Sequence, residues 1–180
     1  MKPISKMSQA EFGAFIQSQL RMEGIDVVLS GEASVAIFSE GKYVSKDLDM
    51  VPEFFLNRRK LSDAMMKIGF EELKSRYFIH PDLDHIVEFP PGPLSVGSEP
   101  VKEIIEIEYA TGILRVISAT DCVKDRLVAF YHWDDKQSLI QAVLVAIRNN
   151  VDLDEIKRWS LVEGSPEKFD EFRSQVMKGA

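Results

Sequence analysis

The chain has 180 residues, and 45% of them are hydrophobic, which is enough to bury the core of one ordinary domain or of a domain with an appendage. Its formal net charge of −7 argues against broad, sequence-independent binding to nucleic acid but leaves room for a local basic path. Cys122 is the single cysteine, which excludes an intramolecular disulfide and a zinc cluster built on cysteines.

The sequence gives no sign of export or of membrane insertion. The first six residues lack the apolar run of a signal peptide. No later segment approaches the ~18 uninterrupted apolar residues that cross a bilayer. We therefore expect a soluble, cytoplasmic protein with no membrane partner.

The first half of the chain alternates between helical and strand patterns. Ser8 and Glu11 occupy the two ends of a capping box, and apolar residues follow at helical spacing until Gly24. Gly31 ends an apolar strand, and Pro52 stops the next one. The expected elements are a strand over 26–29, a short helix over 33–38, a strand over 46–51 and a helix over 56–68 that ends at Gly69.

The second half contains more strands and then becomes helical. A strand or loose hairpin is expected over 70–80, a strand over 85–89, a Pro/Gly-rich turn after it, and a hairpin over 105–117. Helices are expected over 118–133 and about 137–147, then from the cap at 152 to near 164, and from 165 onward. This order predicts an α/β (α+β) fold, with a mixed sheet flanked by helices in residues 1–117 and a helical appendage in residues 118–180 packed on it.

Two aspartates stand out beside the glycine turn. Asp47 and Asp49 are separated by one residue on a predicted strand, so their side chains point to the same face. Carboxylate oxygens are the ligands that Mg²⁺ prefers. The turn at Gly31 allows backbone N–H groups to approach an anionic group at a helix N-terminus. This combination predicts phosphoryl or nucleotidyl transfer with Mg²⁺ as cofactor.

The order strand, Gly31 turn, helix, Asp47-Leu48-Asp49 strand, helix, and a strand with one more carboxylate resembles the nucleotidyltransferase fold. Within that superfamily the chain is similar to the small proteins related to the AbiEii-type abortive-infection toxins, over roughly residues 26–147. The resemblance implies that Glu88 on the later strand is the third metal ligand and catalytic carboxylate beside Asp47 and Asp49. It also implies a nucleoside triphosphate substrate, an RNA or protein acceptor, and an antitoxin partner in a toxin–antitoxin pair.

The same resemblance suggests the nucleotide-binding residues. Ser30, Gly31 and Ser34 belong to the phosphate-binding turn and its helix, Ser45 matches a small hydroxyl residue ahead of the acidic pair, and Lys124 matches a lysine that reaches the phosphates. The sequence around Asp135 weakly resembles the family's later Lys-Asp-x-x-Asp element.

Two other functions remain open from the sequence. Glu32 follows Gly31 where the family has Gly or Ser, and its charge would repel a triphosphate unless the side chain turns away. This residue favours a catalytically degenerate protein that binds a nucleotide weakly or serves as a partner-binding module. The second of these functions is that of an interaction protein whose acidic side chains are exposed to solvent and have no catalytic role.

Overall fold

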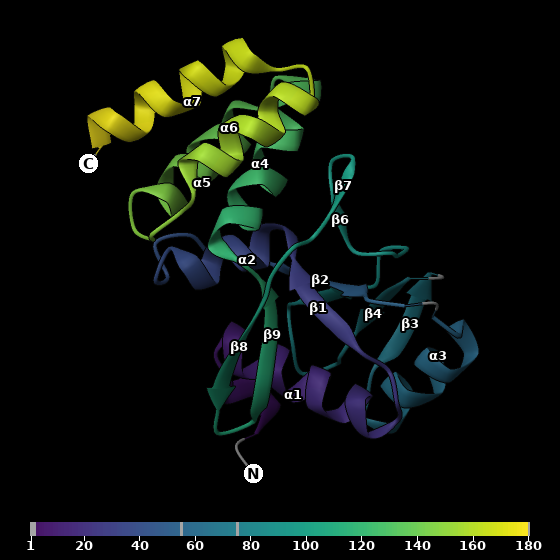
Figure 1. Cartoon of the computed structure of the whole chain (residues 1–180). Coiled ribbons are helices and arrows are strands. Elements are labelled where there is room, and N and C mark those ends of the chain that lie inside the picture. Colours follow the sequence, from purple (N-terminus) through teal and green to yellow (C-terminus); the bar gives the residue numbers. More distant parts are fainter. Residues whose placement is uncertain (1–2, 55, 75, 180) are drawn as a thin grey trace.

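The computed structural model describes residues 3–54, 56–74 and 76–179, which form a mixed sheet with helices on both faces (Figure 1). The first half contains η1 (Ile4–Lys6), α1 (Gln9–Met22), β1 (Val27–Ser30), α2 (Gly31–Phe38), β2 (Asp47–Pro52), α3 (Arg58–Lys67), β3 (Glu71–Lys74), β4 (Tyr77–Ile79) and β5 (Ile86–Glu88). The second half contains β6 (Ser95–Val96), β7 (Glu99–Pro100), β8 (Ile104–Tyr109), β9 (Gly112–Ile117), α4 (Ala119–Trp133), α5 (Lys136–Ala146), α6 (Leu153–Val162) and α7 (Pro166–Gly179).

The main sheet places the two carboxylate-bearing strands side by side. Its strand order is β3-β4-β5-β2-β1-β9-β8. Strand β2 runs antiparallel to β1 and parallel to β5, and β1 runs parallel to β9. The expected class, a mixed sheet with flanking helices and a helical C-terminal part, is confirmed.

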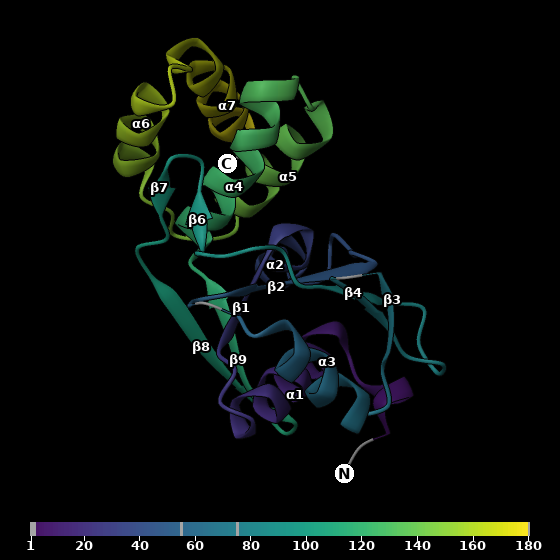
Figure 2. The ribbon, with the colours of Figure 1, turned by 90° about the vertical axis from the view of Figure 1, so that its right-hand side faces the viewer.

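Helices cover the two faces of this sheet unequally. Helices α1 and α3 lie on one face, whereas α2 and the C-terminal helices lie on the other (Figure 2). Gly13 of α1 allows close packing, because a Cβ there would lie 3.0 Å from Leu114 and 3.6 Å from Leu48 and Met50. Leu48 and Met50 therefore face the α1 side, and the residues that alternate with them on β2 face α2.

Side-chain caps start several helices where the sequence predicts them. The Ser8 hydroxyl accepts from the Glu11 N–H at 3.2 Å, and the Glu11 carboxylate accepts from the Ser8 N–H at 2.8 Å, which completes the capping box. Ser118 caps α4, and Asp152 caps α6, each by accepting from the backbone N–H three residues later.

The C-terminal helices α4 to α7 follow β9 directly. Helix α4 packs against both α2 and α5, and Cys122 on α4 is buried against Ser34 on α2 at 3.1 Å. Helix α4 thus lies against α2 on that side of the sheet. No helix in the described part of the chain is long and apolar enough to cross a membrane.

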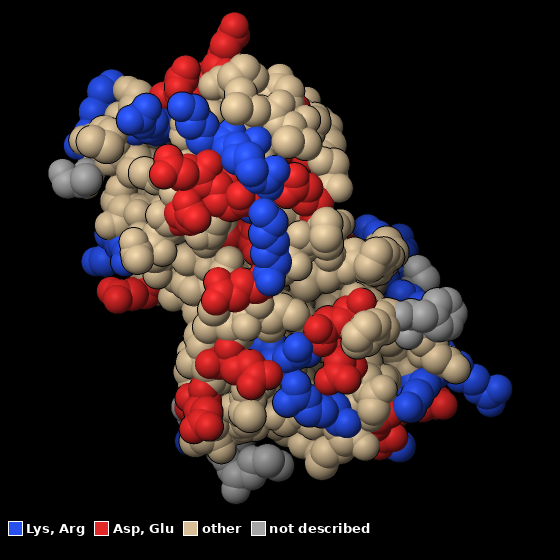
Figure 3. Space-filling model, in the orientation of Figure 1, with Lys and Arg blue, Asp and Glu red and all other residues tan. Residues whose placement is uncertain are grey.

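The small hairpin β6–β7 was not expected from the sequence. Each of its strands has only two residues, which is too short for an alternating pattern to be recognised. It rises from the sheet toward α4 and α6 (Figures 1 and 2). On the face shown in Figure 3, Lys and Arg side chains lie beside Asp and Glu side chains, so no broad basic area forms there.

Candidate functional site

The turn from β1 into α2 places a carboxylate at the start of a helix. Gly31 has φ +62°, and a Cβ at this position would lie 1.9 Å from the Asp49 Oδ2 atom. Only glycine fits both the backbone conformation and this close approach. The Asp49 carboxylate therefore lies directly against the first residue of α2, where helix N–H groups have no intrahelical partner.

Three carboxylates share one face of the sheet. Asp47 and Asp49 alternate with the α1-facing residues of β2, and Glu88 on β5 is the register partner of Asp49. Ser30 on β1 is the register partner of Asp49 on the other side. Because register partners point to the same face, Asp47, Asp49, Glu88 and Ser30 all lie on the α2 side, as the strand alternation predicts.

The three carboxylates nevertheless do not converge on one point. Asp47 is exposed at the start of β2, whereas the Glu88 carboxylate forms an ion pair with the Arg76 Nε atom at 2.9 Å. Among the described residues, no three His, Cys, Asp or Glu side chains are grouped so that they could hold a metal ion. The expected three-ligand shell is thus not formed among the described residues, and Arg76, just before β4, pairs with the third carboxylate.

The electrostatics of the site centre on Asp49. Its pKa is raised from 3.8 to about 7, first because burial removes water from the carboxylate, and then because Glu88, Asp125 and Asp47 are negative neighbours. Arg126 opposes this shift. Asp49 thus has three negative neighbours and one positive neighbour among the groups that shift its pKa.

A cleft of about 290 Å³ opens beside Asp49. Its walls come from Ser30, Gly31, Asp49, Val51, Pro90, Pro91, Pro93, Ser95, Asp125 and Arg126. The cleft is thus built by β1, the α2 N-terminus, β2, the segment after β5, and α4. The arrangement combines a helix N-terminus, the Arg126 guanidinium and the half-buried carboxylates of Asp49 and Asp125 in one hollow.

Sequence reasoning missed Asp125 and Arg126 and chose Lys124 instead. Arg126 donates to the Asp125 carboxylate from Nη2 at 2.6 Å, and its own pKa is raised by Asp125 despite burial. Residues two apart on a helix point to nearly opposite sides, so Lys124 and Arg126 cannot both face the cleft. The amphipathic pattern of α4 could not separate them, because both sides of the helix are covered.

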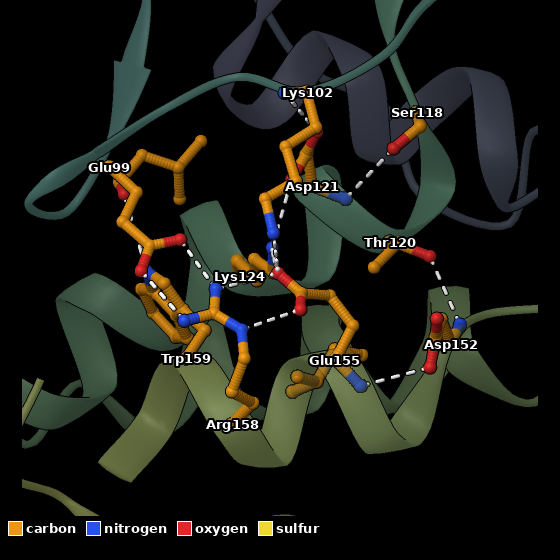
Figure 4. A network of polar contacts seen from close by, with 12 residues as sticks. Glu99, Lys102, Ser118, Thr120, Asp121, Lys124, Asp152, Glu155, Arg158 and Trp159 are labelled. Carbon is orange, nitrogen blue, oxygen red and sulfur yellow. Dashed lines mark hydrogen bonds and ion pairs between the residues drawn. The ribbon is translucent and has the colours of Figure 1, made fainter. Parts of the chain in front are cut away.

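Lys124 lies in a partly buried ion-pair network between α4 and α6 (Figure 4). Its ammonium contacts Glu155 at 2.8 Å and Asp121 at 3.3 Å, and its side chain is 3% exposed. Lys102 and Arg158 bind the same Glu155 carboxylate at 2.6 and 2.7 Å. These bonds lower the pKa of Glu155 well below its ordinary value, the Arg158 contact contributing most. Lys124 thus joins α4 to α6 and does not line the cleft.

The predicted serines mostly make local bonds. The Ser34 hydroxyl donates to the Gly31 carbonyl at 2.7 Å and contacts Cys122, so it points into the α2–α4 interface and not toward the cleft. Ser45 donates to the Asp47 carbonyl at 2.9 Å and accepts from its N–H at 3.2 Å, which shapes the entry into β2. Ser30 alone of the three lines the cleft.

Glu32 turns away from the cleft, as its charge required. Its carboxylate accepts from the Tyr43 hydroxyl and from the Gln141 Nε2 atom at 3.2 Å. Burial and the Glu32 carboxylate raise the pKa of Tyr43 to about 12, so the phenol stays protonated and continues to donate. Asp135 is the N-cap of α5, where it accepts from the N–H groups of Gln137 and Ser138.

Comparison with known proteins gives the fold. No protein-family model matches the chain, and no curated protein matches it by sequence. Among solved structures, the chain is similar to an antigenic nucleotidyltransferase-like protein from Paracoccidioides brasiliensis, with a TM-score of 0.55 at 12% identity over 76% of this chain and 75% of the other. ANT(2″)-Ia in complex with adenylyl-2″-tobramycin gives a TM-score of 0.46 at 12% identity over 91% of this chain and 93% of the other.

The match to the protein from Paracoccidioides brasiliensis covers about three quarters of each chain and concerns the fold. It leaves the AbiEii-type resemblance as an expectation from the sequence. The chain therefore has a nucleotidyltransferase-like fold.

Proposed function

We propose that this protein is a Mg²⁺-dependent nucleotidyltransferase that moves a nucleoside monophosphate from a nucleoside triphosphate to a hydroxyl group of RNA or protein. One observation carries the proposal. The Asp49 carboxylate lies against the N-terminus of α2, on a face of the sheet that also bears Asp47 of β2 and Glu88 of β5. Metal ligands and a phosphate-binding helix end are thereby adjacent.

The chemistry of these residues fits Mg²⁺. Asp47, Asp49 and Glu88 offer hard oxygen ligands on one face. The pKa of Asp49 is raised first by burial and then by the negative neighbours Glu88, Asp125 and Asp47. Asp47, Asp49 and Glu88 would hold the ion, which supplies neutralisation of triphosphate charge when bound. To bind the ion, the Glu88 carboxylate would have to give up its ion pair with Arg76.

The protein's own groups supply the phosphate half of the site. Free N–H groups at the start of α2 attract anions through hydrogen bonding and the helix dipole. Arg126 adds a guanidinium in the same cleft. Together they would orient the triphosphate so that an acceptor hydroxyl approaches the α-phosphorus in line.

A second candidate is a non-catalytic nucleotide-binding or interaction protein. The ion pair between Arg76 and Glu88 favours it, because an internal cation already satisfies the third carboxylate. Glu32 no longer supports this alternative, since its carboxylate is bound by Tyr43 and Gln141 away from the cleft.

The finer biological role rests on the sequence resemblance. We propose an AbiEii-type toxin that acts in the cytoplasm and is held inactive by an antitoxin. Growth of cells expressing the wild type and the Asp47→Asn/Asp49→Asn variant tests this role. Growth arrest by the wild type alone supports it, and equal growth of both strains contradicts it.

Transfer of label tests the enzymatic proposal. The protein is incubated with each of the four α-labelled nucleoside triphosphates, Mg²⁺, total RNA and total protein. We expect label in one acceptor fraction with the wild type and none with Asp47→Asn/Asp49→Asn, whose melting temperature should be no lower than that of the wild type. If the wild type transfers nothing and no nucleotide raises its melting temperature, the non-catalytic alternative is correct.

A further inference from the structure

A second, more apolar pocket adjoins the cleft that holds Asp49. Its volume is about 540 Å³. It is lined by Pro52, Glu53, Phe54, Leu56, Arg58, Pro90, Pro91, Gly92 and Pro93. Pro90, Pro91 and Pro93 also line the cleft, so one segment of chain forms a wall of both hollows. A molecule bound in the pocket would lie next to the reacting end of the cleft.

Four prolines restrict the backbone of the pocket walls. These prolines have fixed φ angles, so ordering them on binding loses little entropy. Gly92 presses this wall onto the end of β2, because a Cβ at that position would lie 2.7 Å from the Pro52 carbonyl oxygen. Phe54 stands at the pocket with 76% of its surface exposed. An exposed aromatic ring beside proline faces is a surface on which a planar ring can stack.

Three cations, Arg58, Arg59 and Lys60, begin the helix beside the pocket, although the chain as a whole is negative. Glu53 forms an ion pair with Arg115, whose guanidinium also lies within 4.0 Å of carboxylate oxygens of Glu106 and Asp26. Arg58 and Arg59 have no ion pair among the described residues, and Lys60 follows them in the first turn of α3, which contains no acidic residue. Cations at a helix N-terminus oppose the helix dipole, so this positive potential is unfavourable for α3 itself. The same positive potential favours the binding of an anion.

We propose that this pocket binds the terminal base of a single-stranded nucleic acid, which is the acceptor in the proposed transfer reaction. The base stacks on Phe54, and the backbone phosphates lie against Arg58, Arg59 and Lys60. The role of this nucleic acid as the acceptor rests on the proposed function. Its binding in the pocket does not. The phosphates of the nucleoside triphosphate belong to the other hollow, beside Gly31 and Arg126, so the second group of cations suits a second set of phosphates.

Fluorescence anisotropy tests the pocket without any reaction. A labelled single-stranded oligoribonucleotide and the deoxy oligonucleotide of the same sequence are titrated with the wild type, without Mg²⁺ or nucleotide. Phe54→Ala should weaken binding by roughly tenfold, because stacking of one base on an aromatic ring contributes about this much. Trp133→Ala is the matched control, since Trp133 is 75% exposed and lies on α4, outside the pocket. Its affinity should equal that of the wild type.

The dependence of oligonucleotide affinity on salt concentration tests the role of Arg58, Arg59 and Lys60. Arg58→Ala should weaken binding and should lower the slope of log affinity against log salt by about 0.7, the value for one phosphate contact with a single strand. The inference is overturned if the wild type binds neither oligonucleotide, or if Phe54→Ala binds as tightly as Trp133→Ala. Labelling of a protein acceptor, equal for the wild type and Phe54→Ala, overturns it as well.

The outcome can be separated from that of the proposed function. Asp47→Asn/Asp49→Asn should bind the oligonucleotide at least as tightly as the wild type, because two carboxylates near a bound polyanion are removed. Binding that depends on Phe54, without nucleotide transfer, supports the pocket and contradicts the enzyme. Nucleotide transfer without oligonucleotide binding supports the enzyme and contradicts the pocket.

Discussion

Asp49 combines two properties that conflict in the metal-free protein. Its carboxylate is placed against a helix N-terminus, yet burial and three negative neighbours raise its pKa to about 7. The unfolded chain, in which the pKa is near 3.8, releases this proton at lower pH than the native protein does. The metal-free native state therefore loses stability as the pH rises from about 4 to about 7.

Replacing Asp49 should reveal this penalty. Asp49→Asn should raise the free energy of unfolding of the metal-free protein more at pH 8 than at pH 5. The gain should grow by on the order of 2 to 3 kcal/mol between these conditions, since one pKa unit corresponds to about 1.4 kcal/mol. Urea denaturation of both proteins at the two pH values measures it. A gain that is equal at both would show that Asp49 is ionised and solvated throughout.

Gly31 should be irreplaceable for a steric reason. Gly31→Ala adds a Cβ where the Asp49 carboxylate lies, and it also places alanine at a positive φ. Gly41→Ala is the matched control, because Gly41 has φ +76° but nothing lies within 4 Å of an added Cβ. Both variants should lose about 1 kcal/mol from backbone strain. Only Gly31→Ala should also lose binding of Mg²⁺ with nucleotide, as calorimetry would show; equal binding by both variants would contradict this account.

At the scale of elements, much of the fold follows from local chemistry. The capping residues Ser8, Ser118 and Asp152 begin helices where expected, because a side-chain oxygen satisfies a free N–H within one turn. The strand alternation correctly places Asp47 and Asp49 on one face. These features depend on a few neighbouring residues, which the sequence shows directly.

The features that sequence reasoning missed depend on distant partners. Arg76 binds Glu88 only because β4 pairs with β5. Arg126 reaches the cleft and Lys124 does not, because α4 is rotated by its packing between α2 and α6. A helix covered on several sides has no single apolar face, so its rotation cannot be read from the sequence.

The two lysines that bind Glu155 should contribute unequally to the free energy of unfolding. Lys124 is 3% exposed, whereas Lys102 is 52% exposed, although both bind the same Glu155 oxygen. Lys124→Met leaves Asp121 without its buried cation and should destabilise the fold by about 3 kcal/mol. Lys102→Met should cost less than about 1 kcal/mol. Chemical denaturation compares the two, and equal losses would mean that water screens the network throughout.

At the scale of the whole molecule, the C-terminal helices complete the site. Asp125 and Arg126 of α4 line the cleft together with Ser30, Gly31 and Asp49 from the sheet and α2. The packing of α4 on α2 also buries Cys122, whose pKa is raised to about 12 by loss of water, so the thiol remains protonated. We therefore expect the sheet and the helical appendage to unfold together.

The two tryptophans allow a direct test of this cooperativity. Trp133 and Trp159 both lie in the C-terminal helices, so tryptophan fluorescence reports on the appendage, whereas far-ultraviolet circular dichroism reports on the whole chain. The two signals should give one denaturation midpoint. A fluorescence transition at lower denaturant concentration would show that residues 118–180 unfold separately.

Calorimetric titration of a non-hydrolysable nucleoside triphosphate with Mg²⁺ tests the central claim, that the Asp47 and Asp49 face is a metal–nucleotide site. The wild type should bind at least one of the four nucleotides only when Mg²⁺ is present, and binding should be lost in Asp47→Asn/Asp49→Asn while the melting temperature of the metal-free variant is maintained or raised. Binding that is equally tight in the variant, or in the wild type without Mg²⁺, would contradict it.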